Sequence, residues 1–328
     1  MSAPGTAANQ PQPSITAAYA YCREIARREA KNFYWAFRVL PRHKSDAMCA
    51  IYAFMRRADD ISDDESKPLE QRRGEMAMWL DGWRATSLRD EDAPSSQASA
   101  MSLTATSDLT VFRALRDTQH RFSIPDSLLE ELIAGTTMDL NPQTADESGV
   151  QTYATFEELY RYCYLVASVV GLVSIRVFGY SDKQAEALAE ETGIAFQLTN
   201  ILRDVKEDIE RGRVYIPLDL MEDFGETVPE LRELAAGRTM TERERGMLAT
   251  LAIRAERYYV AGRKLVPLVD RDSRAAMWVL MAIYHRLLSR IGERQMEVFA
   301  ERITVPTATK VFILARGIAM AAWNRILP

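Results

Sequence analysis

Apolar residues recur every three or four positions along most of this chain, from about Ala17 onward. This spacing is typical of amphipathic α-helices, and neither the alternation of a half-buried β-strand nor a hairpin turn is evident. Glycine and proline are scarce, and several prolines stand where helices are expected to begin or end: Pro41, Pro125, Pro142 and Pro217. The pattern predicts an all-α fold.

Two segments depart from the helical pattern. Residues 1–16 are rich in Ala, Pro and Gln without an apolar stretch, which predicts a disordered N-terminal tail rather than a signal peptide. Residues 85–108 are rich in Ser, Ala and Thr, which predicts a mobile loop between helices. No internal repeat of fixed period is found. Residues 17–328 are therefore interpreted as one all-α domain.

Two acidic clusters lie about 140 residues apart. Asp59 and Asp63 are spaced i, i+4, as are Asp204 and Asp208, so each pair shares one face of a helix. Like charges at this spacing destabilise an isolated helix by about 0.2–0.5 kcal/mol, so a compensating cation is expected. Mg²⁺ prefers carboxylate oxygens and is usually shared with substrate phosphates. The pattern predicts two acidic helices that face each other across a central cavity and bind a magnesium diphosphate.

Other polar residues share a face with these aspartates. Tyr52 and Arg56 precede the first pair at helical spacing, while Gln197 and Asn200 precede the second. The opposite face of the second helix is apolar and comprises Ile194, Leu198, Ile201, Leu202, Val205 and Ile209. A solvated charged face is the alternative interpretation of either cluster alone. Two such clusters embedded in apolar sequence favour a functional site.

Arginines and aromatic residues near the clusters suit a prenyl diphosphate. Arg56, Arg203 and Arg213 are candidate diphosphate ligands, because the guanidinium fork fits phosphate oxygens. Phe33 and Phe37 form one aromatic stripe at helical spacing, and Phe156, Tyr160 and Tyr164 form another. Such stripes usually belong to a core. Beside a diphosphate site, each ring could stabilise an allylic carbocation by about 0.5–2 kcal/mol and exclude water.

Composition narrows the remaining possibilities. The content of 47% hydrophobic residues and the net charge of −5 fit a globular protein and give no reason to expect a nucleic-acid partner. Three scattered cysteines and three scattered histidines offer no zinc spacing and favour a reducing, cytoplasmic location. No nucleotide-binding fingerprint is present, so NADPH is not expected. The apolar segment Val311–Leu327 predicts a packed last helix or a helix resting on a membrane surface.

Together these motifs resemble the squalene/phytoene synthase family, the head-to-head prenyl synthases. The resemblance runs from about Tyr19 to Lys310. Its most specific segments are residues 50–63, Tyr162–Ala167 and Gln197–Asp204 with its continuation to Pro217. It implies an isoprenoid synthase helical bundle in which both aspartate motifs bind two or three Mg²⁺ ions and two prenyl diphosphates.

The motifs and the resemblance give a set of candidate site residues. The expected metal ligands are Asp59, Asp63, Asn200, Asp204 and Asp208. The catalytic set adds three tyrosines to these aspartates, namely Tyr52, Tyr164 and Tyr215. The expected substrate-binding residues are Phe33, Phe37, Arg56, Gln197, Asn200, Arg203, Arg213, Tyr284, Arg302 and Lys310. Asn32 departs from the serine or threonine of several relatives.

Three segments look most like bacterial presqualene diphosphate synthases, namely Tyr162–Gly171, Asn200–Pro217 and Ala282–Lys310. The expected reaction is therefore the condensation of two farnesyl diphosphates to presqualene diphosphate with release of diphosphate. Several alternatives stay open: a phytoene synthase that joins two geranylgeranyl diphosphates, an NADPH-dependent squalene or dehydrosqualene synthase, a terpene cyclase, and a non-catalytic helical assembly factor. Tunnel depth is expected to decide between the farnesyl and geranylgeranyl chains.

Overall fold

The computed structural model describes residues 14–30, 33–86, 105–140 and 149–326. Within these ranges the chain is helical, and its β-structure is limited to two isolated bridges, Gln151–Arg213 and Tyr180–Val269. The predicted all-α class is confirmed. The elements are, in chain order, α1 (Ile15–Glu29), α2 (Phe33–Phe37), α3 (Arg42–Ser62), α4 (Leu69–Ala85), α6 (Thr106–Arg121), α7 (Asp126–Thr137), the 3₁₀-helix η1 (Met138–Leu140), α8 (Phe156–Cys163), the π-helix η2 (Tyr164–Ser168), α9 (Val169–Phe178), α10 (Gln184–Glu210), α11 (Leu218–Asp223), α12 (Val228–Ala235), α13 (Glu242–Leu265), α14 (Arg274–Glu293) and α15 (Thr307–Ile326).

Three of the prolines that the sequence analysis placed at helix ends immediately precede helices. Pro41, Pro125 and Pro217 are the N-cap residues of α3, α7 and α11. Proline has no backbone N–H to donate and a fixed φ, so the start of a helix accommodates it without loss of a hydrogen bond. Pro142 lies outside the described residues.

The first helix starts earlier than predicted. The side chain of Ser14 accepts a hydrogen bond from the Ala17 backbone N–H at 3.2 Å, and α1 begins at Ile15. Such a cap satisfies a donor that the first helical turn otherwise leaves unpaired. Ile15 and Thr16 therefore belong to a helix rather than to the predicted tail. The rest of that tail, residues 1–13, lies outside the described residues.

The predicted loop at 85–108 is also shorter at both ends. Helix α4 extends through Ala85, and α6 starts before Asp108. The Asp108 carboxylate is buried and accepts a hydrogen bond from Arg57 Nε at 3.0 Å, which ties the first turn of α6 to α3. Residues 87–104 of the predicted loop lie outside the described part of the chain.

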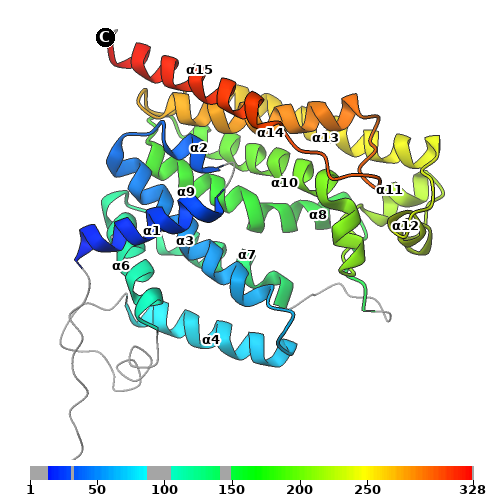
Figure 1. Cartoon of the computed structure of the whole chain (residues 1–328), viewed down its shortest axis with the longest axis horizontal. Coiled ribbons are helices and arrows are strands. Elements are labelled where there is room, and N and C mark those ends of the chain that lie inside the picture. Colours follow the sequence, from blue (N-terminus) through cyan, green and yellow to red (C-terminus); the bar gives the residue numbers. More distant parts are fainter. Residues whose placement is uncertain (1–13, 31–32, 87–104, 141–148, 327–328) are drawn as a thin grey trace, which may run out of the picture.

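Helix α10 runs through the middle of the molecule and packs against α9, α13, α14 and η2 (Figure 1). Helix α15 lies along one edge of the molecule and α4 along the opposite edge. The predicted apolar face of α10 is buried throughout and comprises Ile194, Leu198, Ile201, Leu202, Val205 and Ile209. Burial of this face turns the polar face of α10 toward the interior cavities described below.

Helix α3 is held by an aromatic cluster. The Phe54 ring lies 4.6 Å from Trp79 and 5.1 Å from Trp83 of α4, and 6.2 Å from Phe112 of α6, between ring centroids. All four side chains are buried. Tilted ring pairs at these distances contribute beyond their buried area. The cluster fixes α3 on its outer side, so its inner side faces α9 and α10.

One continuous helical run, Phe156–Phe178, is long and apolar enough to cross a membrane by length and composition, among the residues that could be searched. It joins α8, η2 and α9. Leu159, Cys163, Val169 and Val173 are fully buried inside the protein. Its apolar character is that of a core helix.

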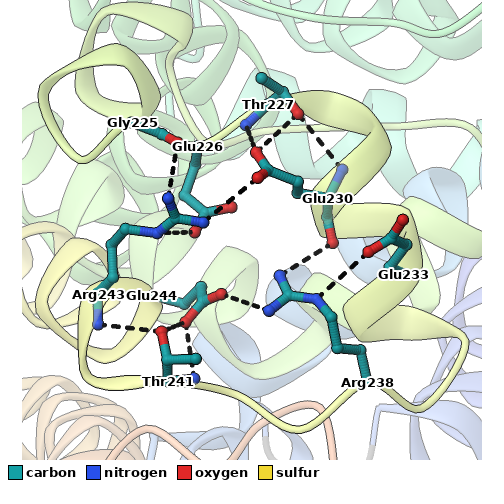
Figure 2. A network of polar contacts seen from close by, with 9 residues as sticks. All are labelled: Gly225, Glu226, Thr227, Glu230, Glu233, Arg238, Thr241, Arg243 and Glu244. Carbon is teal, nitrogen blue, oxygen red and sulfur yellow. Dashed lines mark hydrogen bonds and ion pairs between the residues drawn. The ribbon is translucent and has the colours of Figure 1, made fainter.

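The corner between α11, α12 and α13 is held by charged side chains (Figure 2). The side chains of Glu226 and Glu244 are fully buried there, and each pairs with an arginine. Arg243 Nε lies 2.7 Å from Glu226 Oε1, and Arg238 Nη1 lies 2.8 Å from Glu244 Oε1. Thr241, the N-cap of α13, donates its backbone N–H to Glu244 at 2.7 Å. Buried carboxylates are stable only when compensated in this way.

Arg238→Met should therefore lower the free energy of unfolding by about 3 kcal/mol at neutral pH, because it leaves the Glu244 carboxylate buried without its cation. Burial acts to raise the pKa of Glu244, but hydrogen bonds from Thr241 and Arg238 lower that pKa to about 2. A lowered pKa contributes stability above the unfolded-state value of about 4.3 and loses it as the pH falls further.

The measurement is urea unfolding of both proteins at pH 7 and pH 4, and the stability difference should shrink at pH 4. Arg232→Met removes an exposed arginine from the same corner and serves as the control. Equal stability of wild type and Arg238→Met at pH 7 would contradict the compensating role of Arg238.

Candidate active site

Two adjoining cavities lie between α3, α9, α10 and the first half of α14. The first is polar, with a volume of about 520 Å³, and the second is apolar, with a volume of about 320 Å³. Both are lined by the same six residues where they meet, namely Met55, Arg56, Asp59, Val166, Gln197 and Asn200. The shared lining makes the two cavities one elongated site with a charged end and an apolar end.

Helices α3 and α10 run in the same direction along this site. On α3 the lining passes from Met48 in the apolar cavity to Asp63 in the polar one, and on α10 from Ala189 to Asp208. Helix α9 runs the opposite way, because its lining residues extend away from the polar cavity as far as Phe178. The apolar cavity is therefore bounded by α3 and α10, which run in one direction, and by α9, which runs in the opposite direction.

All four predicted aspartates line the polar cavity. Asp59 lies on α3 and Asp63 is the C-cap residue of that helix, while Asp204 and Asp208 lie on α10. The predicted convergence of the two acidic helices on one cavity is confirmed by this lining. In the described part of the chain, no three His, Cys, Asp or Glu side chains are grouped closely enough to hold an ion by themselves. A metal at this site would need oxygen ligands from a substrate as well, which is the usual arrangement for Mg²⁺.

Asp204 is the most constrained of the four. It accepts a hydrogen bond from Arg203 Nε at 2.7 Å and pairs with Arg302 Nη2 at 2.8 Å. Arg302 also lies 3.4 Å from Glu207, and it comes from the segment between α14 and α15. Both arginines line the polar cavity. Two cationic forks thus stand beside the aspartates, where the oxygens of a diphosphate would be placed.

Asp208 has an unusual environment. Burial and the neighbouring Asp204 raise the pKa of Asp208 to about 7, while Arg213 and Arg211 act to lower it. A carboxylate in such surroundings gains from any cation that approaches it. Arg213 lines the same cavity, and its backbone N–H donates to the Asp208 carbonyl oxygen at 2.8 Å.

Two polar atoms at the junction of the cavities have no hydrogen-bond partner. Asn200 Oδ1 and Arg56 Nε are buried and unpaired. Arg56 pairs through its terminal nitrogen with Asp60 at 2.5 Å, while Asn200 donates to Gln197 at 3.3 Å. A buried unpaired oxygen is costly. It fits the chemistry of a metal ligand or of an acceptor for a bound molecule.

Four of the predicted aromatic residues line the apolar cavity. Phe33 and Phe37 of α2, Tyr52 of α3 and Tyr284 of α14 all face it. Burial raises the pKa of both Tyr52 and Tyr284 to about 12, so each phenol keeps its proton at neutral pH. Phe33 lies 5.7 Å from Tyr284 between ring centroids. The rings form one aromatic wall beside the diphosphate end.

Phe196 belongs to this wall, and the sequence interpretation missed it. Its ring stacks on Tyr284 at 4.4 Å with an interplanar angle of 13°. It also lines the apolar cavity, one turn before Asn200 on α10. Extending the polar stripe of α10 backward by its own helical spacing would have found it.

A second aromatic group stands behind Asp208 and includes the predicted Tyr215. The hydroxyl of Tyr162 donates to that of Tyr215 at 3.0 Å, and their rings stack at 4.8 Å. The Tyr153 ring lies 5.8 Å from Tyr215, and Gln151 donates to the Tyr153 hydroxyl at 2.7 Å. Tyr162 and Tyr215 line the polar cavity. Tyr153 and Gln151 come from a segment with no helical pattern, so sequence periodicity gave no signal for them.

Two predicted site residues line neither cavity. Tyr164 donates its hydroxyl to Glu131 at 2.8 Å, and burial followed by this bond raises its pKa to about 12. The helix widens into η2 at Tyr164, so the extra residue per turn rotates the side chain away from the position that an α-helix would give it. Tyr160 of the same predicted stripe donates to Glu190, and Phe156 packs beneath Arg254. Lys310 lies on α15 and is not among the residues that line either cavity.

The wall formed by η2 is packed backbone to backbone. A Cβ atom on Gly193 of α10 would lie 2.5 Å from Ser168 Cα, and one on Gly135 of α7 would lie 2.4 Å from the Leu165 carbonyl oxygen. Neither distance is possible for a real side chain. Glycine at these two positions lets α7 and α10 approach η2 closely, which brings Asn200 and Val166 to the same junction.

The remaining predicted residues Gln197, Asn200 and Arg56 lie where the cavities meet, as described above.

Comparison with known proteins gives a consistent result. The family model described as squalene/phytoene synthase matches residues 26–309. A phytoene synthase of Mycobacterium tuberculosis is 33% identical over 305 residues, covering 93% of this chain and 92% of the relative. A 15-cis-phytoene synthase of Synechocystis is 33% identical over 330 residues, covering 96% and 87%.

Solved structures show the same likeness. A dehydrosqualene synthase in complex with a ligand superposes with a TM-score of 0.74 at 26% identity, covering 94% of this chain and 98% of that one. The squalene synthase HpnC from Alicyclobacillus acidocaldarius superposes with a TM-score of 0.69 at 25% identity, covering 86% and 95%.

Proposed function

This chain belongs to the squalene/phytoene synthase family and is a prenyltransferase, and we propose that it joins two farnesyl diphosphates into presqualene diphosphate with release of one diphosphate. The observation that carries the proposal is the placement of an apolar cavity of limited length next to a cavity lined by four aspartates and four arginines. The charged end suits diphosphate, and the apolar end suits a prenyl chain.

The length of the apolar cavity supports a farnesyl chain. Met48 and Asp59, which lie at its two ends on α3, are separated by about 16 Å, because an α-helix rises about 1.5 Å per residue. An extended carbon chain advances about 1.25 Å per bond, so a farnesyl chain spans about 14 Å and a geranylgeranyl chain about 19 Å. Ala189 and Asn200 give the same separation on α10, and the wall formed by η2 and α9, lined from Val166 to Phe178, is about 18 Å long.

Divalent metal is implied by the family, and the residues present fit it. Asp59, Asp63, Asp204 and Asp208 offer carboxylate oxygens on opposite sides of the polar cavity, and Asn200 Oδ1 is an unpaired buried oxygen. These residues would hold two or three Mg²⁺ ions. When bound, Mg²⁺ neutralises the charge that develops on departing diphosphate oxygens.

The protein's own groups then act on the substrate. Arg203 and Arg302 bind and orient the diphosphate, so that the C1–O bond of the first farnesyl group breaks with its electron pair going to diphosphate. The C2–C3 double bond of the second farnesyl group attacks C1, and loss of a proton closes the cyclopropane ring. Phe33, Tyr52 and Tyr284 face the intermediate cation and exclude water from it.

A phytoene synthase that uses geranylgeranyl diphosphate is the second candidate, because relatives at 33% identity carry that name. The apolar end is lined partly by Met48 and Met277. Methionine is flexible and adapts to irregular shapes, so these side chains could rearrange to admit a longer chain.

The test is to incubate the purified protein with Mg²⁺ and either farnesyl or geranylgeranyl diphosphate, with and without NADPH, and to identify products by mass spectrometry. We expect presqualene diphosphate from farnesyl diphosphate in both conditions, at a rate at least tenfold above that with geranylgeranyl diphosphate. Phytoene as the main product would establish the second candidate instead. Squalene formed only with NADPH, or dehydrosqualene formed with or without it, would show that the reaction continues past the cyclopropane.

The compartment is also a proposal. Cys22, Cys49 and Cys163 are free thiols and all are buried. Free thiols are typical of a reducing compartment. We therefore propose a cytoplasmic location, which fractionation of the native host would test.

A further inference from the structure

The last helix is apolar on two faces. Its inner face packs on α14 through Ile313, Leu314 and Gly317, where a Cβ on Gly317 would lie 2.3 Å from a Val279 methyl carbon. The opposite face, called here the outer face of α15, comprises Val311, Phe312, Ala315, Ile318, Ala319, Ala322 and Trp323. All of these outer residues are exposed. A surface helix normally presents polar residues on its outer side, so this face needs an explanation.

The exposed area is concentrated on this helix. Phe312 is 68% exposed and Trp323 is 65% exposed, while Ile318 and Val311 are about half exposed. These four make up half of the large apolar side chains that are exposed in the described part of the protein. A contiguous apolar patch of this kind marks an interaction surface rather than ordinary surface.

The charge of the segment identifies the partner. Residues 303–328 contain Lys310, Arg316 and Arg325 but no aspartate or glutamate, in a chain whose net charge is −5. Arg316 lies over the Trp278 ring at 4.9 Å, at the border between α15 and α14. Basic residues next to an apolar face bind anionic lipid headgroups while the apolar side chains enter the acyl region. A second copy would instead place like charges against like charges across a symmetric contact.

We propose that the outer face of α15 docks this protein on the surface of an anionic phospholipid bilayer. The helix lies on the membrane rather than crossing it, because Lys310 and Arg316 interrupt its apolar sequence. Phe312 and Trp323 enter the interface, and the basic residues contact headgroup phosphates.

Docking through α15 would place the membrane close to the apolar cavity. Helix α14 lies directly beneath it (Figure 1). Ala275 and Val279 of α14 contact α15, whereas Met277 and Leu280 line the apolar cavity. Packed helices are about 8–10 Å apart, so a single helix separates the docked surface from the cavity. A bilayer at this edge would stand next to the site of an apolar reaction.

The test is sedimentation of the full-length protein with vesicles of phosphatidylcholine alone or mixed with phosphatidylglycerol. The wild type should bind the mixed vesicles at least tenfold more tightly than the neutral ones, and less tightly in high salt. The double variant Phe312→Glu with Trp323→Glu should lose at least tenfold in binding. Met78→Glu is the matched control, because Met78 is 59% exposed on α4 at the opposite edge, and it should bind as the wild type does.

Circular dichroism shows whether each variant is folded, and Phe312→Ser with Trp323→Ser provides a milder pair if the charged pair is not. Equal binding of wild type and double variant would overturn the proposal, as would equal binding to both kinds of vesicle. A wild-type dimer that the double variant converts to a monomer, without vesicle binding by either, would assign the face to a second copy instead. None of these readouts depends on prenyl diphosphate turnover, so the proposed reaction is tested separately.

Discussion

Replacing Asp204 by asparagine should lower the turnover of prenyl diphosphate by at least about 10²–10³-fold, the loss typical when one charge-stabilising group is removed from an active site. Asp204 lies at the charged end of the site and holds both Arg203 and Arg302. Asparagine keeps the shape of the side chain but removes its charge, so it neither attracts a cation nor fixes the two guanidinium groups. The side chain borders a cavity, so the helices should remain intact.

Asp59→Asn should have an effect of the same size, because Asp59 lines both cavities from the opposite wall. Asp60→Asn is the matched control. Asp60 is the next residue on α3, but it pairs with Arg56 and lines a separate groove outside the two cavities. Its replacement should change turnover by less than about tenfold, the scale of a single exposed ion pair.

Steady-state kinetics at saturating magnesium and circular dichroism measure both effects. Near-normal turnover of Asp59→Asn or Asp204→Asn at saturating magnesium would contradict the assignment of these carboxylates as metal ligands. A loss in Asp60→Asn as large as in Asp59→Asn would show that charge density, rather than position, controls the rate.

Ser174→Phe should lower kcat/KM for farnesyl diphosphate by more than about 100-fold, because each methylene excluded from an apolar pocket costs about 1–3 kcal/mol. Ser174 lies on α9 in the half of the apolar cavity that is remote from the aspartates, one helical turn before Phe178. Its hydroxyl donates only to the Val170 carbonyl oxygen, at 2.7 Å. The larger ring would occupy space that the end of the prenyl chain needs.

Geranyl diphosphate, which is one isoprene unit shorter, should be affected at least tenfold less than farnesyl diphosphate by the same substitution. Ser174→Ala keeps the cavity open and is the control for loss of the hydroxyl. Equal losses for the short and the long substrate would indicate a folding defect or a different position of the chain, and the proposed direction of the cavity would then be wrong.

Much of this architecture could be predicted from the sequence because it depends on helical spacing. Three local patterns each predict one arrangement. The i, i+4 spacing places two aspartates on one helix face, the apolar residues of α10 form one buried face, and the prolines mark the starts of α3, α7 and α11. The convergence of the two acidic helices followed because each has a polar face that borders a long apolar one. Such faces are stable only around a shared interior.

The rest depended on features that have no local pattern. Tyr164 was expected in the site from the family resemblance and from a stripe at α-helical spacing, but in the π-helix η2 its hydroxyl donates to Glu131 instead. The contribution of Tyr153 comes from a segment without periodicity. The length of the apolar cavity depends on which side chains from four helices meet at one end. That meeting is a tertiary property, and no single segment encodes it.

The two sides of the apolar cavity differ in how much they can vary. The side formed by η2, α7 and α10 is fixed by main-chain contacts at Gly135 and Gly193, where any substitution would force the helices apart. The side formed by α3 and α14 is lined by the side chains of Met48, Met55 and Met277, which can be exchanged without moving the backbone. The capacity of the apolar cavity can therefore change through side chains such as these methionines, while the main-chain contacts at Gly135 and Gly193 keep the helices at a fixed separation.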